Sequence, residues 1–167
     1  MLEARTIGGL IALAAGFLAL LGVRAGTAKP DVSSAAALKR VLLDTDAVAY
    51  FPDGEVGKHF ASVLERLGIA ADMKTKLRPV GAGGASPAAV AKREADLAIA
   101  FIPAILGTPG VEVAGRFPAE LAYGIDLSAG AGMGAKDAQA AKALLEFIAS
   151  PQGMASMKAK GFEPLAR

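Results

Sequence analysis

Cysteine is absent from the 167-residue chain, and aromatic residues make up only 5% of it. Without cysteine the chain can form no disulfide bridge, no thiolate metal site and no cysteine nucleophile. Hydrophobic residues account for 53% of the sequence, and alanine and glycine dominate. We therefore expect one domain of ordinary size, with a core of small side chains on closely packed helices and strands.

The sequence also lacks a cluster of charged residues of one sign. The formal net charge is +2, and a nucleic-acid interface would need basic residues clustered on one face. The sequence contains no HExxH helix, no G-x-S-x-G turn and no converging metal ligands. The single histidine, His59, falls inside a predicted helix, where a structural role is favoured. We expect no nucleic-acid partner, no enzyme, no metal and no cofactor.

The first 28 residues, MLEARTIGGLIALAAGFLALLGVRAGTA, differ from the rest, because Arg5 precedes an uncharged stretch over residues 6–23. Small residues near the end of this segment suit signal peptidase. The favoured interpretation is an export signal cleaved after Ala28, and the second is an uncleaved membrane anchor. A buried strand or helix of a globular domain is the third. The predicted division is thus a leader followed by an α/β domain over residues 29–167.

Strand and helix patterns alternate in that domain. Ser33 or Ser34 can cap the first helix, because a serine oxygen accepts from the free N–H groups of the first turn. Apolar runs predict strands over 47–51, 76–80, 97–101, 111–117 and 122–133. Apolar residues at helical spacing predict helices over 56–69, 86–93, 137–150 and 151–161. This order indicates an α/β fold with a mainly parallel sheet flanked by helices.

A glycine-rich turn, GAGGAS, lies directly before one predicted helix. It fits neither a phosphate-binding P-loop nor a dinucleotide fingerprint, and taken alone such a loop is commonly a simple turn. The free N–H groups at a helix start nevertheless stabilise an oxyanion. Gly83 and Gly84 would let an anion reach the backbone. The segment FPDGEVGKHF is also a strand, a turn and a helix start, so two helix N-termini can form a crevice where α/β sheets bind ligands.

The segments VGKHFASVLERLGIA, VAKREADLAIAF, GVEVAGRFPAEL and AKALLEFIASPQGMASMKAKGFEP together resemble the molybdate-type substrate-binding proteins of bacterial ABC transporters. The resemblance covers residues 29–165, and the closing FIASPQGMASMKAKGFEP is its most specific part. It implies a type II periplasmic-binding-protein-like fold, periplasmic localisation, a small oxyanion as ligand and an ABC permease as partner. By position it implies a binding site made of Val56, Gly57, Gly83, Gly84 and Phe101.

The sequence departs from that family in three ways, one of which is that YFPDGE is shorter than the family's serine- and glycine-rich turn. Most of the N-terminal lobe is expected to be missing, and GVRAGTAKPD resembles the family's crossover strand. Phe101 stands where these proteins often carry a tyrosine, and it cannot donate a hydrogen bond. One lobe offers half of a ligand shell, so we expect weak binding of molybdate, tungstate or sulfate. The alternative is a membrane-tethered, ligand-free interaction module of the same fold, which self-associates through the face of the missing lobe.

Overall fold

The computed structural model describes residues 6–7, 10–11, 15–127, 129–132 and 134–164. It divides into two compact units, one made of residues 1–17 and 125–167 and the other of residues 18–124. Parts of the predicted leader, residues 1–5, 8–9 and 12–14, lie outside the described residues, as do positions 128 and 133 of the predicted strand 122–133.

A mixed sheet forms the centre of the unit 18–124, with the strand order β5-β4-β6-β3-β7. These strands are β3 (Ala15–Arg24), β4 (Val48–Tyr50), β5 (Leu77–Pro79), β6 (Leu97–Phe101) and β7 (Val111–Arg116). β4 is parallel to β5 and to β6, whereas β3 is antiparallel to both β6 and β7. Four of these five strands run in one direction and β3 runs against them, so the expected α/β fold is confirmed and the sheet is mixed, with antiparallel pairing on both sides of β3, where a mainly parallel sheet was expected.

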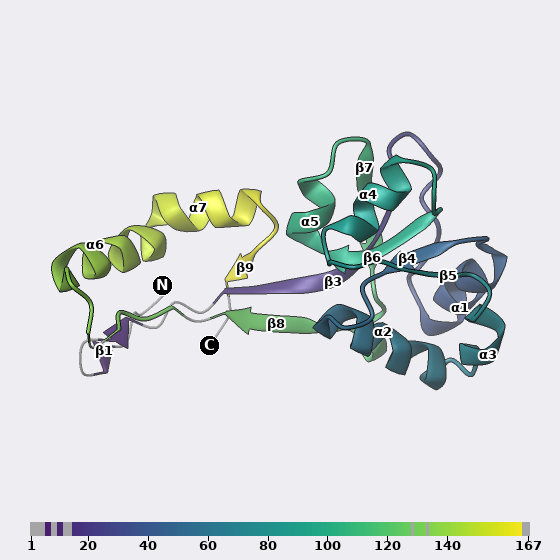
Figure 1. Ribbon diagram of the computed structural model, residues 1–167, viewed down its shortest axis with the longest axis horizontal. Coiled ribbons are helices and arrows are strands. Elements are labelled where there is room, and N and C mark those ends of the chain that lie inside the picture. Colours follow the sequence, from purple (N-terminus) through teal and green to yellow (C-terminus); the bar gives the residue numbers. More distant parts are fainter. Residues whose placement is uncertain (1–5, 8–9, 12–14, 128, 133, 165–167) are drawn as a thin grey trace. The chain divides into compact units, whose positions relative to one another are not determined.

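Helices cover both faces of this sheet. They are α1 (Ala35–Asp44), α2 (Glu55–Arg66), α3 (Ala70–Met73), α4 (Ala85–Ala91) and α5 (Ile102–Leu106), with a short 3₁₀ helix, η1 (Ala119–Leu121). Figure 1 shows α1, α2 and α3 on one side of the sheet and α4 and α5 on the other. Ser34 caps α1 by accepting a hydrogen bond from the N–H of Ala37 at 3.2 Å, so the expectation of a serine cap is confirmed.

Successive strand residues point to opposite faces, so one strand contributes to two cores. Leu21, Val48 and Ile99 are buried in the core that also holds side chains of α1, α2 and α3. Leu20 and Ala100 pack on the other face with residues of α5, and Ala49 and Ala98 pack there with residues of α4. The small side chains expected from the composition therefore lie mainly beneath α4, where they let a helix approach the sheet closely.

The other unit holds α6 (Ala138–Ala149) and α7 (Pro151–Ala159), as the sequence predicted. Ser150 ends α6 and caps α7, because its Oγ accepts from the N–H of Gly153 at 3.2 Å. The short strands assigned to this part of the chain are β1 (Thr6–Ile7), β2 (Leu10–Ile11), β8 (Gly124–Leu127) and β9 (Glu163–Pro164). β1 pairs with β2, and both β8 and β9 pair with β3.

The predicted leader contains β3, the strand that lies between β6 and β7 in the sheet. Leu20 and Leu21 are 1% and 0% exposed, so this part of residues 1–28 is a buried strand in the structure, and the three interpretations of the segment stay predictions. Cleavage after Ala28 would remove β3 from the fold, and the boundary at that residue stays a prediction. Among the residues that the structure describes, none of the helices has the length and apolarity that a membrane span needs.

Candidate anion site at the carboxyl edge of the sheet

A cavity of about 240 Å³ lies where β4 and β6 end and the next helices begin. The five residues predicted from the sequence, Val56, Gly57, Gly83, Gly84 and Phe101, all line it. They come from three places in the chain, namely the start of α2, the loop before α4 and the last residue of β6. The carboxyl end of parallel strands is where open α/β sheets bind ligands. The structure thus brings the predicted residues together, and their role in binding stays a prediction.

The first turn of α2 contributes Glu55, Val56 and Gly57 to the residues that line this cavity. Gly54 is the N-cap residue, and no side chain caps the helix. The N–H of Lys58 is the first to be bonded within the helix, to the carbonyl of Gly54 at 3.0 Å. The preceding N–H groups have no carbonyl available within the helix and carry partial positive charge. Val56 and Gly57 thereby offer donors that an anion can use.

Gly57 allows α2 to start close to the end of β4. A Cβ atom built on Gly57 would lie 1.8 Å from the carbonyl oxygen of Phe51, and one on Gly54 would lie 2.6 Å from the Phe51 ring. Real side chains never approach so closely, so any larger residue would move the first turn of α2. The two glycines therefore set where the donors of α2 lie.

The glycine loop before α4 is open where the start of α2 is crowded. A Cβ atom at Gly83 or at Gly84 would meet no atom within 4 Å. α4 begins at Ala85 without a side-chain cap, and the N–H of Ala85 is already bonded to the carbonyl of Ala82 at 3.0 Å. Two residues after Gly84, the Ser86 side chain is fully buried, and its Oγ has no hydrogen-bond partner within the described part of the chain.

The remaining walls of the cavity are apolar. They are formed by Phe51, Ile99, Ala100, Phe101 and Ala104. Phe101 is the last residue of β6 and the N-cap of α5, so an aromatic ring stands where the resemblance implied a hydroxyl group. The sequence did not predict the other four of these lining residues. Phe51 directly precedes the predicted turn, and Ile99 and Ala100 belong to a strand whose burial alone says nothing of a cavity.

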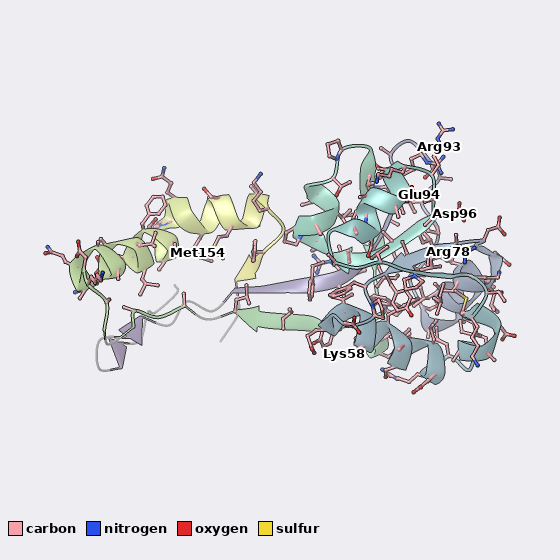
Figure 2. The ribbon with its side chains drawn as sticks, in the orientation of Figure 1. Lys58, Arg78, Arg93, Glu94, Asp96 and Met154 are labelled. Carbon is pink, nitrogen blue, oxygen red and sulfur yellow. The ribbon has the colours of Figure 1, made fainter. Side chains whose placement is uncertain are left out.

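Glu55 has the one ionisable side chain among the residues that line the cavity. Its carboxylate pairs with Lys58 Nζ at 3.0 Å, and it accepts a hydrogen bond from Tyr123 Oη at 3.5 Å. The hydrogen bond from Lys58, together with its positive charge, lowers the pKa of the Glu55 carboxyl below its ordinary value. Lys58 projects from the first turns of α2 (Figure 2). Glu55 therefore places a carboxylate, not a counter-charge, beside the expected anion site.

His59 has the structural surroundings that the sequence indicated. Its imidazole stacks on the ring of Tyr123, with centroids 4.6 Å apart, and meets Phe117 edge-on at 5.9 Å. Its Nε2 lies 2.8 Å from the carbonyl oxygen of Leu121. The histidine is not among the residues that line the cavity. Within the described residues, no three histidine, aspartate or glutamate side chains gather into a group that could hold a metal ion.

The chain is 29% identical over 147 residues to the aconitate isomerase of a Pseudomonas species, a match that covers 87% of this chain and 55% of that protein. It therefore spans about half the length of that relative.

Two solved structures share the fold. A substrate-binding domain assigned to a molybdenum ABC transporter of Clostridium difficile superposes with a TM-score of 0.72 at 19% identity, covering 95% of this chain and 67% of its own. The periplasmic molybdate-binding protein of Azotobacter vinelandii gives a TM-score of 0.66 at 19% identity, covering 97% and 70%. The type II periplasmic-binding-protein-like fold is thereby confirmed.

The match to a protein family extends over residues 11–163 and so includes β3 as well as the cavity. It takes in nearly all of the described residues of both units. The chain belongs to the family of bacterial extracellular solute-binding proteins.

Proposed function

We propose that this chain acts as the periplasmic substrate-binding component of an ABC transporter and takes a small oxyanion, with molybdate as the first candidate. Backbone N–H groups of Val56 and Gly57 and of Gly83 and Gly84 would hold the anion, and Phe101 would border it. The observation that carries this proposal is the cavity itself, which joins the uncapped start of α2 to the open glycine loop. An ABC permease in the membrane would receive the ligand.

Three further observations support the proposal. The family is one of extracellular solute-binding proteins, and two proteins of the same fold carry molybdenum or molybdate in their names. The aconitate isomerase is named as an enzyme. In this chain, however, the cavity is lined by one ionisable side chain, Glu55, which is already paired with Lys58. We therefore propose binding without chemical conversion of the ligand.

Isothermal titration of the full chain with molybdate, tungstate, sulfate and short carboxylates tests the proposal. At least one anion should bind, and Gly84→Leu should abolish that binding, because its side chain would enter space that is open beside the cavity. Gly81→Leu is the matched control, since Gly81 belongs to the same loop, has equally open surroundings and does not line the cavity. Absence of binding for every anion, or equal loss in both variants, would contradict the proposal.

Self-association through an apolar surface is a second candidate, favoured by α6. Leu144 and Phe147 lie three residues apart on this helix and are 58% and 53% exposed. Neighbouring exposed apolar side chains often mark an interaction surface. As a ligand-free module, tethered to a membrane through residues 6–23, the chain would sediment as a dimer. The double variant Leu144→Ser, Phe147→Ser should then sediment as a monomer; a monomeric parent chain would exclude this candidate.

A further inference from the structure

We infer that the natural ligand of the cavity is an organic acid, meaning a carboxylate on a short carbon chain, and not a bare inorganic oxyanion. This inference rests on the proposed function, because it uses the same site and the same donors, and it replaces molybdate by a carboxylate as the ligand of that site. It is carried by the chemistry of the eleven residues that line the cavity and by the place of Glu55 among them.

The side chains that line the cavity offer it no hydrogen-bond donor. No serine, threonine, tyrosine, lysine or arginine is among the lining residues, so the donors are backbone N–H groups near the start of α2 and in the glycine loop. A tetrahedral oxyanion presents acceptor oxygens in every direction, and an acceptor without a donor pays the full cost of desolvation. A carboxylate presents its two oxygens on one side and carbon on the other.

The other lining residues suit carbon. Phe51, Ile99 and Phe101 are among them, and apolar surface gains by meeting apolar ligand atoms instead of water. An apolar cavity of about 150 Å³ is large enough for benzene. At about 240 Å³ this cavity has room for a chain of several carbon atoms beyond the carboxylate.

Charge leads to the same ligand class. Glu55 lines the cavity, and its carboxylate is paired with Lys58 Nζ at 3.0 Å. No cationic side chain is among the lining residues. The site therefore has no net positive charge with which to stabilise the second negative charge of a dianion. A singly charged acid that keeps its carboxylate at the α2 donors is therefore favoured over a doubly charged oxyanion.

Titration of the full chain with formate, acetate, butyrate and hexanoate, and in parallel with molybdate and sulfate, tests the inference. We expect affinity to rise by about fourfold for each added methylene until the cavity is full. Phe101→Ala should reduce the gain in affinity for each added methylene and leave the affinity for acetate nearly unchanged. Leu106→Ala removes an apolar side chain from a 53% exposed position that does not line the cavity and is the control that should keep the parent's rise.

Different experimental results would contradict the inference and the proposed function. Molybdate or sulfate binding more tightly than hexanoate, or acid affinity independent of chain length, would overturn the organic-acid inference and leave an anion-binding protein. Absence of binding for both series would overturn the proposed function as well. A chain-length dependence that Leu106→Ala flattens as strongly as Phe101→Ala would show that the acids bind elsewhere, and would also overturn the inference.

Discussion

Gly57 and Phe51 approach each other so closely that a Cβ atom on residue 57 would lie 1.8 Å from the Phe51 carbonyl oxygen. This contact joins the first turn of α2 to the residue that follows β4, and both residues line the cavity. The position of the donors of α2 thus depends on the absence of a side chain at residue 57.

Gly57→Ala should destabilise the fold and weaken anion binding together. The added methyl group forces the start of α2 away from Phe51, and overpacking of this kind costs about 1–3 kcal/mol. Urea unfolding followed by circular dichroism measures the change. In Gly83→Ala the new methyl group meets no atom within 4 Å. The free energy of unfolding of this variant should therefore lie within about 0.5 kcal/mol of the parent's, as is usual for surface substitutions. Equal stability of the two variants would contradict the close approach.

Leu21→Ala should cost about 2–5 kcal/mol of unfolding free energy, because Leu21 is completely buried on β3. Leu106→Ala is the control, since Leu106 is 53% exposed and its truncation should change stability by about 0.5 kcal/mol or less. Mass spectrometry of the protein exported by cells tests the same point. A folded product that begins after Ala28 would show that β3 is dispensable.

Ser86→Ala should leave stability unchanged within about 1 kcal/mol or raise it, because the buried Ser86 hydroxyl has no partner among the described residues and its removal ends a desolvation cost. Ser34→Ala makes the same chemical change at a helix cap, where the oxygen accepts from Ala37, and should cost about 1 kcal/mol. Thermal unfolding compares the two. A clear loss of stability on Ser86→Ala would reveal a partner for that hydroxyl.

Lys58→Met should raise the pKa of Glu55, because Lys58 is the main cause of its lowered value. A pKa that is lower in the folded chain than in the unfolded one stabilises the fold above the unfolded value, and this contribution disappears as the pH falls through the folded value. The parent should therefore exceed the variant in stability at neutral pH and not in strong acid. Carbon-13 NMR titration of the Glu55 carboxyl measures the shift; an unchanged pKa would contradict it.

Much of the fold could be predicted because its elements have local sequence signals. The strand predicted over 97–101 matches β6 residue for residue, and the break between α6 and α7 falls at Pro151 as expected. β3 could not be distinguished from a leader in the same way. A central antiparallel strand with apolar residues on both faces has the composition of a signal core, so no local pattern indicated its pairing with β6 and β7.

The site could be predicted only in its backbone part. Helix starts and glycine turns are visible in a sequence, so the structure places Gly57 and Gly83 at one cavity as expected. The apolar walls depend on tertiary contacts that no local pattern records. Ala104 belongs to α5, a helix of five residues, which is too short to produce a helical period in the sequence.

Backbone amide chemical shifts of the full chain test the central claim most directly, because they report on each proposed donor separately. Nitrogen-15 spectra would be recorded during titration with butyrate and then with molybdate. The account predicts that the amide signals of Val56, Gly57, Gly83 and Gly84 move together along one saturable curve with at least one of the two anions. Signals that stay in place at these four residues, while others move or none do, would contradict it.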